Sequence, residues 1–473
     1  MNPLPSQGLS AILGFVKKLF RKGEQAAPQA GSTLPRVYAR PEHGISRSQI
    51  SENALKVLYR LRKAGYQAYL VGGCVRDLQL GREPKDFDVV TDAHPEQIKN
   101  VFRNCRLIGR RFRLAHVHFG REIIEVATFR ALATEEDEGG DRVVENGRIL
   151  RDNIYGTIEE DAWRRDFTVN ALYYNIQDFS VVDFVGGMDD HKAGTLRLIG
   201  DPEKRYHEDP VRMLRAVRFA TKLGFLIHPS CAEPLPRLAP LLGGIPAARL
   251  YDEVVKLFLS GYALQNFEQL RHYDLFHQLF PLTDECLSLE DNAYPLTFVA
   301  KALENTDKRI AEDKPVAPYF LFAALLWEPV RIQAEAAIAK GVHEIIAYQE
   351  ASADVTDEQA DYTAYPRSIS QPMRDVWQLQ PRFKARNGGR PFRLLTHPRF
   401  RAAYDFLVLR AQTGSAEPEL AEWWTRFQAA GEAEQKAMAS GQKTGGGGGG
   451  AGKKRRPRRR GPGARKPHDS ANS

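Results

Sequence analysis

Patterns typical of β-strands almost vanish from this chain after about residue 200. Beyond that point, leucine-rich segments with the apolar spacing of helices follow one another to residue 431. Before it, short runs of β-branched and aromatic residues alternate with helical segments. The helical part shows no repeat of fixed period, so a solenoid is not supported. The sequence therefore predicts an α+β head followed by an all-α region.

Strands and helices can be placed along the head from its apolar periods and glycines. The pattern predicts helices over 46–65, 74–81 and 94–102, strands over 66–73 and 85–90, and a hairpin formed by 113–119 and 122–129 across Gly120. Residues 133–148 are acidic, contain glycine and have no clear period, so we expect a mobile loop there.

Two aspartates lie one residue apart in the second of these strands. If residues 85–90 are extended, Asp86 and Asp88 share a face, with Cα atoms roughly 6.6 Å apart. A strand, the pair Gly72-Gly73, a helix and then this DxD strand form the arrangement of a nucleotidyl-transferring site: a phosphate cradle beside two metal ions. The alternative is a solvated polar strand edge, which for an isolated DxD would be the better interpretation.

Two further motifs carry polar side chains next to apolar segments. "RRDFTVNAL" (164–172) contains Asp166, whose plain interpretation is the N-cap of a helix, a role compatible with lying beside the metals. "YHEDPVRMLRAVRF" predicts a helix with Asp209 as N-cap and Pro210 at its first position. Its residues Asp209, Arg212, Arg215 and Arg218 form a stripe that suits recognition of a base and phosphates, or equally a structural ladder of ion pairs.

The net charge of +8 comes from the end of the chain. Residues 441–473, which include a glycine run, hold ten Lys/Arg and one acidic residue, and this leaves −1 for the rest. This composition predicts a disordered tail that binds RNA or DNA, with a purely solubilising end as the alternative. At the other terminus, residues 9–22 form a basic amphipathic pattern that would contact a membrane surface or dock on the protein. Four widely separated cysteines suit a reducing cytoplasm.

Five motifs in order, "YLVGGCVRD", "KDFDVVT", "RRDFTVNALYY", "DFVGGMDDHKAGTLRLIG" and "EDPVRMLRAVRFA", resemble the bacterial tRNA nucleotidyltransferase and poly(A) polymerase family. The resemblance is strong over residues ~50 to 230, and "LIGRRFRLAHVHFG" resembles the segment that distinguishes the poly(A) branch from CCA-adding enzymes. It implies a polymerase β-like head with a mixed sheet, then helical neck and body regions. The implied domains are 1–45, an amphipathic segment and linker; 46–190, the head; 191–255, the neck; 256–440, an RNA-binding body; and 441–473, the tail.

The resemblance also implies site residues. Asp86 and Asp88 would bind two Mg²⁺ ions and carry catalysis, with Asp166 as a further active-site acid and Glu125, on the strand "EIIEVATF", held in reserve for that role. ATP would be the substrate. The nucleotide-binding residues would be Gly72, Gly73, Arg76, Arg165, Asn170, Asp209, Arg212 and Arg215.

A basic track between residues 381 and 401 predicts contacts with single-stranded RNA. Its cations are Arg382, Lys384, Arg386, Arg390, Arg393, Arg399 and Arg401, and Phe383, Phe392 and Phe400 would either stack on bases or belong to a core. The sequence thus favours a template-independent poly(A) polymerase acting on RNA 3′ ends. We expect a cytoplasmic monomer, with the RNA-decay machinery among its partners. The alternatives are CCA addition to tRNA and, less favoured, an RNA-binding protein with an inactive head.

Overall fold

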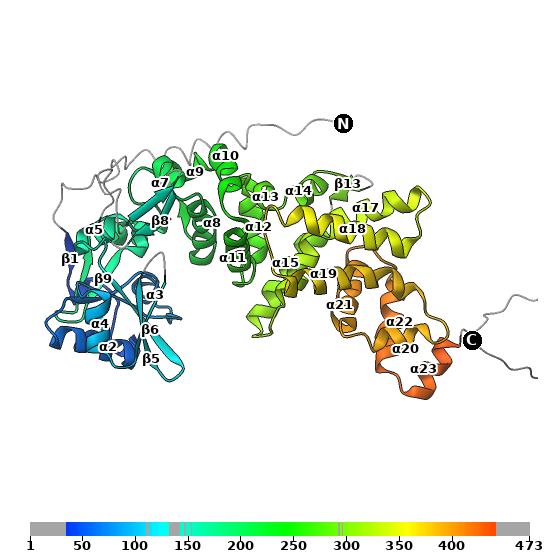
Figure 1. Cartoon of the computed structure of the whole chain (residues 1–473), viewed down its shortest axis with the longest axis horizontal. Helices are drawn as coiled ribbons and strands as arrows, with labels where there is room; N and C mark the ends of the chain where they lie inside the picture. The colour runs from blue at the N-terminus through cyan, green and yellow to red at the C-terminus, as the bar shows by residue number, and fades with distance from the viewer. Residues whose placement is uncertain are drawn as a thin grey trace, which may run out of the picture.

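The computed structural model describes residues 35–109, 113–131, 142–145, 148–152, 154–291, 294–295 and 297–440. The predicted amphipathic helix and the basic tail lie outside these residues. The chain forms an arch in which the head, the neck helices and the body follow one another (Figure 1). This arrangement confirms the predicted fold class, an α+β head followed by a region that is helical apart from two short strand pairs.

The head is built on a mixed eight-stranded sheet in the order β1-β10-β9-β2-β3-β6-β5-β4. β3 and β6 run parallel, and the other neighbours in this sheet run antiparallel. The strands are β1 (Arg36–Tyr38), β2 (Ala68–Val71), β3 (Asp88–Thr91), β4 (Cys105–Ile108), β5 (Leu114–Phe119), β6 (Glu122–Thr128), β9 (Leu172–Asn175) and β10 (Val181–Asp183). The predicted hairpin is confirmed as β5 and β6.

Two helices cover one face of the sheet, α2 (Glu52–Lys63) and α4 (Pro95–Val101). α2 begins where the Ser51 hydroxyl accepts the N–H groups of Asn53 and Ala54, and its buried side includes Val57 and Leu61. Alternation along β3 sends Val89 into this core and Val90 to the opposite face, which α5 (Ile158–Trp163) closes in part. Asp88 therefore lies on the face away from α2.

Three expectations for the head need correction. Residues 36–38 belong to the sheet as β1, so the linker interpretation is wrong there. The loop expected over 133–148 contains the strand β7 (Arg142–Glu145), which pairs with β8 (Arg148–Asp152) at and beyond the end of that range. The strand expected over 85–90 begins only at Asp88, and Asp86 lies in the irregular segment before it.

The neck and body are helical, as predicted. Their elements are α6 (Gly187–Ala193), β11 (Thr195–Leu196), α7 (Pro202–Glu208), α8 (Val211–Leu223), β12 (Leu226–Ile227), α9 (Pro229–Ala232), α10 (Leu235–Leu238), η5 (Ala239–Gly244), α11 (Ala247–Phe258), α12 (Ala263–His272), α13 (Leu275–Leu279), α14 (Pro281–Leu287), β13 (Glu290–Asp291), β14 (Tyr294–Pro295), α15 (Phe298–Ala311), α16 (Pro318–Leu325), α17 (Trp327–Ala339), α18 (Glu344–Gln359) and α19 (Arg367–Leu379). One apolar core runs through them from Phe167 to Leu409.

A last group of helices has a core of its own. It comprises η6 (Gln380–Lys384), α20 (Arg390–Leu395), α21 (Phe400–Gln412), α22 (Pro418–Ala429) and α23 (Glu432–Ala439), packed around Phe383 and Trp424. Among the helices of the described residues, none is both long and apolar enough to cross a membrane.

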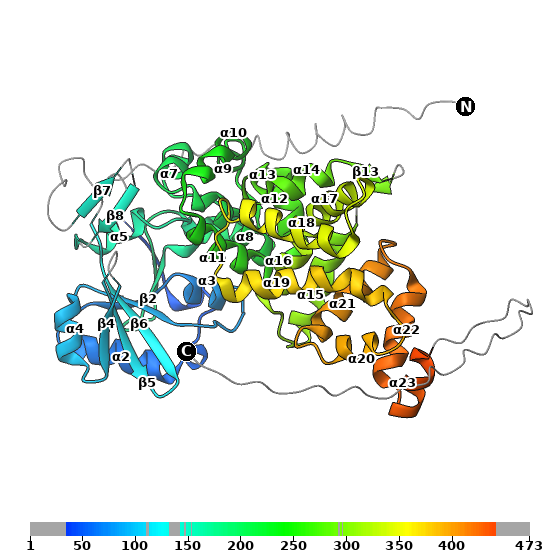
Figure 2. The same ribbon diagram turned by 45° about the vertical axis from the view of Figure 1, so that its right-hand side comes forward.

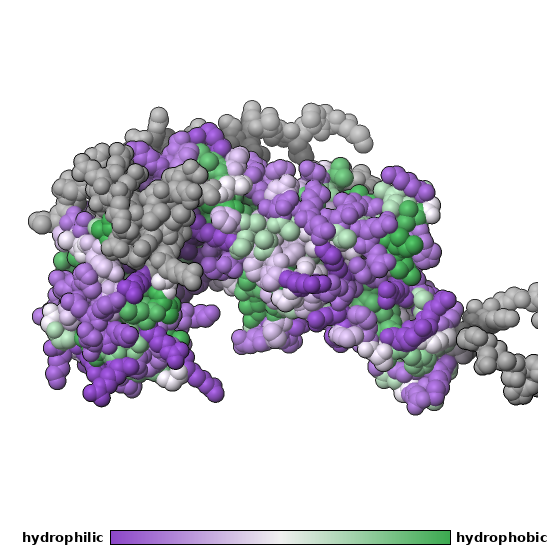
Figure 3. Space-filling model, viewed as in Figure 1, coloured by the Kyte–Doolittle hydropathy of each residue, from purple (hydrophilic) through white to green (hydrophobic). Residues whose placement is uncertain are grey.

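A hollow separates the head from the body beneath the neck helices α8 and α11 (Figures 1 and 3). The space-filling view shows mostly hydrophilic side chains along its sides. Figure 2, turned by 45°, shows α3 (Gly73–Gln79) on the part of the head nearest to the neck and body. The glycine pair and the DxD segment flank this helix in sequence.

Candidate active site

Two carboxylates from neighbouring parallel strands meet on the open face of the head sheet. Asp88, the first residue of β3, pairs in register with Glu125 in the middle of β6. The imidazole Nε2 of His116, on β5, lies 3.4 Å from a Glu125 carboxylate oxygen. Asp86, exposed just before β3, adds its charge nearby. Three acidic side chains are thus brought to one place by the strand order.

The raised pKa of Asp88 shows that the negative charge of the three carboxylates is not fully compensated by cations of the protein. Burial raises the pKa of Asp88 to about 6, and the charges of Glu125 and Asp86 act in the same direction, against the guanidinium of Arg165. Within the described ranges, no group of three His, Cys, Asp or Glu side chains is arranged closely enough to hold a metal ion as it stands. The donor set is nevertheless all carboxylate oxygen, the chemistry that Mg²⁺ prefers.

Gly72 places backbone directly beside these groups. It precedes α3 with φ +77° and ψ −135°, a conformation that residues with a side chain rarely adopt. A Cβ at this position would lie 3.7 Å from Nη1 of Arg165 and 4.0 Å from Oδ2 of Asp88. Gly73 begins the helix itself. The glycine turn, Arg165 and Asp88 therefore form one cluster, and their role in binding a nucleotide stays a prediction.

Arg165 is held in that cluster by a buried network. Its Nε and Nη2 donate to Oδ2 of Asp161 at 3.0 and 2.8 Å, and Nε also contacts the hydroxyl of Tyr173 at 3.0 Å. Burial alone would lower the pKa of Arg165, but Asp161 and Tyr173 outweigh it and raise the pKa. Nη1 remains on the side of Gly72. Sequence reasoning missed Asp161, although its spacing of four residues before Arg165 was a usable signal.

Arg76 and Asn170 lie in the interior. Arg76 is 2% exposed, and its Nη1 donates to Oδ1 of Asn170 at 2.6 Å while Nε and Nη2 donate to Asp77. Its guanidinium also lies over the ring of Phe219, in α8. In this conformation, both residues connect α3 to neighbouring elements, and their role in binding triphosphate stays a prediction.

Asp166 forms a bidentate pair with the neck. Its Oδ2 accepts from Nε and Nη2 of Arg215 at 2.9 and 2.5 Å, and its Oδ1 accepts from the backbone N–H of Phe167. Burial would raise the pKa of Asp166, but Arg215 and these hydrogen bonds lower it to about 2. The capping interpretation is wrong, because Phe167 precedes the short helix η4 (Thr168–Asn170). Glu125, rather than Asp166, faces Asp88 across the strand pair.

Ion pairs occupy the polar stripe of α8. Asp209 binds Arg249 of α11 at 2.7 Å, Arg212 binds Glu208 at 2.8 Å, and Arg218 lies 4.0 Å from Glu253. The expected cap needs a small correction, because Pro210 occupies the N-cap position and Asp209 accepts the N–H of Val211 at 3.3 Å. In this conformation, the stripe therefore forms the structural ion pairs that were the alternative to base recognition. Base recognition by the same residues stays a prediction.

The predicted RNA track lies on the surface of the C-terminal helices. Six of its seven cations are exposed, and Arg399 is half-buried over the ring of Tyr319. Lys384 binds Glu344 and Arg401 binds Asp405. The stacking alternative is wrong for Phe383 and Phe400, which are buried in the C-terminal core, and Phe392 packs against Phe427. The track thus offers charge without free aromatic rings from these three residues.

Three protein-family models match the chain: "Poly A polymerase head domain" over residues 68–197, "Probable RNA and SrmB- binding site of polymerase A" over 224–287 and "Polymerase A arginine-rich C-terminus" over 340–461. Poly(A) polymerase I of Salmonella typhi is 51% identical over 433 residues, which cover 90% of this chain and 93% of that protein. Poly(A) polymerase I of Haemophilus influenzae is 48% identical over 390 residues, with 81% and 86% covered.

CCA-adding enzymes share part of this similarity. That of Lactobacillus helveticus is 37% identical over 216 residues, which cover 46% of this chain and 52% of that protein. Among solved structures, the Bacillus stearothermophilus CCA-adding enzyme in complex with CTP matches with a TM-score of 0.52 at 26% identity, over 80% of this chain and 82% of that one. The fold is therefore common to both branches, whereas similarity over almost the whole length is found with the poly(A) polymerases.

Proposed function

The chain belongs to the bacterial poly(A) polymerase I family, and on that premise we propose that it is a template-independent adenylyltransferase that extends RNA 3′ ends with AMP from ATP. The observation that carries this proposal is 51% identity over 90% of the chain to a poly(A) polymerase I, together with the cluster of Gly72, Asp88 and Glu125. The CCA-adding alternative is less well supported, because that similarity covers under half of the chain.

The reaction joins the RNA 3′ oxygen to the α-phosphorus of ATP. The bond from that phosphorus to the oxygen bridging to the β-phosphate breaks, pyrophosphate leaves, and the proton of the 3′-hydroxyl is lost to solvent or a nearby carboxylate. Asp86, Asp88 and Glu125 are the residues that would hold two Mg²⁺ ions. When bound, these ions would lower the pKa of the hydroxyl and neutralise the phosphates.

The protein's own groups would position the nucleotide. The backbone N–H groups at Gly72 and Gly73, at the start of α3, are suited to donate hydrogen bonds to triphosphate oxygens. Nη1 of Arg165 lies on the side of Gly72, and Nη2 of Arg76 lies beside Gly73. The base would extend toward α8. There, Asp209 would release Arg249, Arg212 would release Glu208, and both would form hydrogen bonds with the polar edge of the base. Base selection would then require these ion pairs to rearrange.

RNA would reach the site from the body. The exposed cations at 382–401 and the basic tail supply contacts to phosphates that do not depend on sequence. The family model at 224–287, described as a probable RNA-binding site, supports RNA binding by this half of the chain. The proposal also includes three further points: the protein acts in the cytoplasm as a monomer, it associates with the RNA-decay machinery, and residues 9–22 contact a membrane.

Pyrophosphate release coupled to the RNA 3′ end tests the proposal. With ATP and an unstructured RNA, we expect many pyrophosphates per RNA end, and none when the terminal 3′-hydroxyl is replaced by hydrogen. The Asp88→Asn variant serves as the inactive control. Pyrophosphate release that continues without the terminal 3′-hydroxyl, or without RNA, would contradict transfer of AMP to RNA ends.

A further inference from the structure

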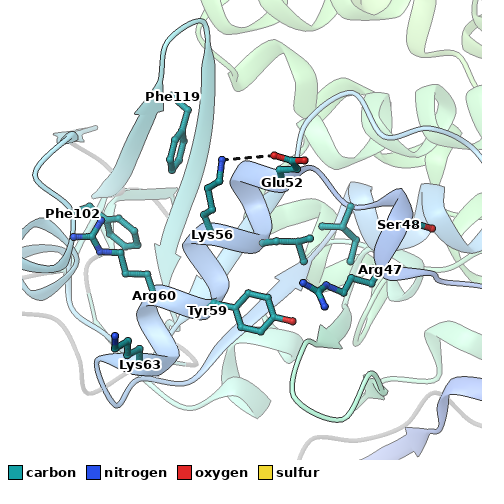
Figure 4. Close-up of a pocket in the computed structure, with 11 residues that line it drawn as sticks. Arg47, Ser48, Glu52, Lys56, Tyr59, Arg60, Lys63, Phe102 and Phe119 are labelled. Carbon is teal, nitrogen blue, oxygen red and sulfur yellow. Dashed lines mark ion pairs between the residues drawn. The ribbon is translucent and has the colours of Figure 1, made fainter.

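An open pocket of about 1160 Å³ lies on the outer side of α2, and we call it the α2 pocket (Figure 4). Its charged and aromatic lining comes from Arg47, Glu52, Lys56, Tyr59, Arg60, Lys63, Phe102 and Phe119. The inner side of α2 packs on the sheet face that carries Val89. Asp88 and Glu125 extend from the other face, so the α2 pocket is separate from the candidate active site.

The cations of the α2 pocket are ordered along one side of a helix. Lys56, Arg60 and Lys63 are spaced by four and three residues, so they project from the same side, about 6 Å and 4.5 Å apart along the axis. Arg47 reaches the pocket from η2 (Arg47–Gln49). Glu52 is the one acidic residue in the described lining, and its pair with Lys56 is long, at 3.9 Å, and exposed.

The other three cations are available for a ligand. Across the described part of the chain, Arg47, Arg60 and Lys63 have no ion pair with a carboxylate. Two of them lie over aromatic rings instead, Arg47 over Tyr59 and Arg60 over Phe102, each 5.3 Å from the ring centroid. A guanidinium fixed in this way keeps its N–H edges free for anions. Uncompensated positive charge is therefore held in a preformed arrangement.

An exposed aromatic ring lies among these cations. Tyr59 is 41% exposed and lies between Arg60 and Arg47, while Phe119 stands across the pocket on the β5–β6 hairpin (Figure 4). Arg47 lies over the Tyr59 ring, so a base would stack on the part of the ring that remains exposed. Cations beside an exposed aromatic ring suit sequence-independent binding of single-stranded nucleic acid, because phosphates meet the charges and bases stack on the ring. The basic track at 382–401 lacks such a ring among its own phenylalanines.

Helix stabilisation does not explain the whole cluster. Basic residues in a last turn favour the helix dipole, which would account for Arg60 and Lys63. Arg62 already serves that turn and is hydrogen-bonded to Asn175 and Gln177 on the other side. Arg47 and Lys56 lie outside the last turn. Both nevertheless line the same pocket, and the helix dipole does not account for them.

We propose that the α2 pocket binds the phosphate backbone and a base of single-stranded RNA, at a segment upstream of the 3′ end being extended. The choice of RNA rests on the proposed function. An acidic protein segment would also match the charge, but the exposed Tyr59 ring between the cations favours a nucleic acid. A growing strand would thus have a contact on the head in addition to those on the body.

The paired substitution Arg60→Gln/Lys63→Gln tests the charge. Its control is Lys308→Gln/Lys340→Gln, which removes two exposed cations from the body. Binding is measured with labelled RNAs of about 40 and about 8 nucleotides, because single-strand sites cover about 4–16 nucleotides. For the long RNA we expect the Kd to rise about tenfold, and the slope of log K against log salt to become less steep by about 1.4, which corresponds to two lost phosphate contacts.

Binding and adenylation of the short RNA should be unchanged in the Arg60→Gln/Lys63→Gln variant. If the parent protein itself does not adenylate the short RNA, the proposed function fails, and this result is distinct from a failure of the pocket proposal. A long-RNA affinity and salt slope equal to those of the control variant would overturn the proposal. Loss of binding to poly-glutamate with unchanged RNA binding would also overturn it, and would assign the pocket to an acidic protein segment.

Tyr59 tests the stacking contact separately. Tyr59→Leu should weaken binding of the long RNA about tenfold, because stacking of one base is lost, whereas Tyr59→Phe should retain it. The exposed position means that both variants should unfold at the temperature of the parent protein. Equal affinities for the Leu and Phe variants would contradict a base on this ring.

Discussion

Asp88 and Asp166 are both aspartates of family motifs, yet their surroundings give them different tasks. Asp88 faces Glu125 and lacks a strong cationic partner, so it is suited to bind a cation from solution. Asp166 is satisfied by a bidentate arginine from the neck. The motifs predicted which residues matter. They could not predict this division, because it depends on strand register and on the packing of α8 against the head.

Asp88→Asn should reduce AMP transfer by at least about a thousandfold, because it removes a charged oxygen donor from the metal-binding set. The thermal unfolding midpoint should stay the same or rise at pH 7, since repulsion with Glu125 is relieved. Asp354→Asn, on the exposed side of α18, is the matched control and should be fully active. Activity of the Asp88 variant within tenfold of the parent protein would contradict the site assignment.

Asp166→Asn should destabilise the protein by about 3 kcal/mol at pH 7, because it leaves the largely buried Arg215 without its carboxylate. The depressed pKa of Asp166 means that its contribution is fully present above the ordinary aspartate pKa and is lost as the pH falls toward about 2. Chemical unfolding at several pH values measures this. A difference between the two proteins that persists unchanged at pH 2 would show that the charge is not responsible.

At the scale of elements, the sequence predicted the helices and central strands of the head well, because apolar period and glycine positions mark them. The sequence did not predict strands that form only through pairing with residues distant in the chain or within polar segments. β1 forms only because β10 offers an edge, and β7 and β8 pair within a polar segment without a strong apolar alternation. The burial of Phe383 and Phe400 likewise depends on α22, distant in sequence.

Gly72→Ala tests the glycine turn before α3. The required φ of +77° is strained for alanine by about 1–3 kcal/mol, so the turn would shift and move Arg165 and Asp88, which an added methyl group would only contact at ordinary distance. We expect kcat/KM for ATP to fall at least tenfold. Gly44→Ala, at a position with open space around it, should leave kcat/KM unchanged. Equal kinetics for both variants would mean that the turn does not shape the nucleotide site.

At the scale of the whole molecule, the arch separates a head that carries carboxylates from a body that carries exposed cations (Figure 1). The sequence predicted this division through the loss of strand signals and through the five motifs. The relative placement of head and neck could not be predicted, because it arises from contacts such as that of Arg215 with Asp166.

Deletion of residues 441–473 should weaken RNA binding most at low salt and make its salt dependence less steep, since ten Lys/Arg act through counterion release. Titration of labelled RNA at several salt concentrations measures this. The catalytic rate at saturating RNA should be unchanged, because the head is intact. An unchanged salt slope would show that the tail does not contact RNA.

Product length with single nucleotides tests the central claim most directly. With an unstructured RNA primer, ATP alone should give long adenosine runs on a sequencing gel, and CTP alone should give little extension. A tRNA lacking its CCA end serves as the competing substrate. If the only efficient products are CCA ends on that tRNA, with CTP required and a single terminal A added, the chain is a CCA-adding enzyme and the account is wrong.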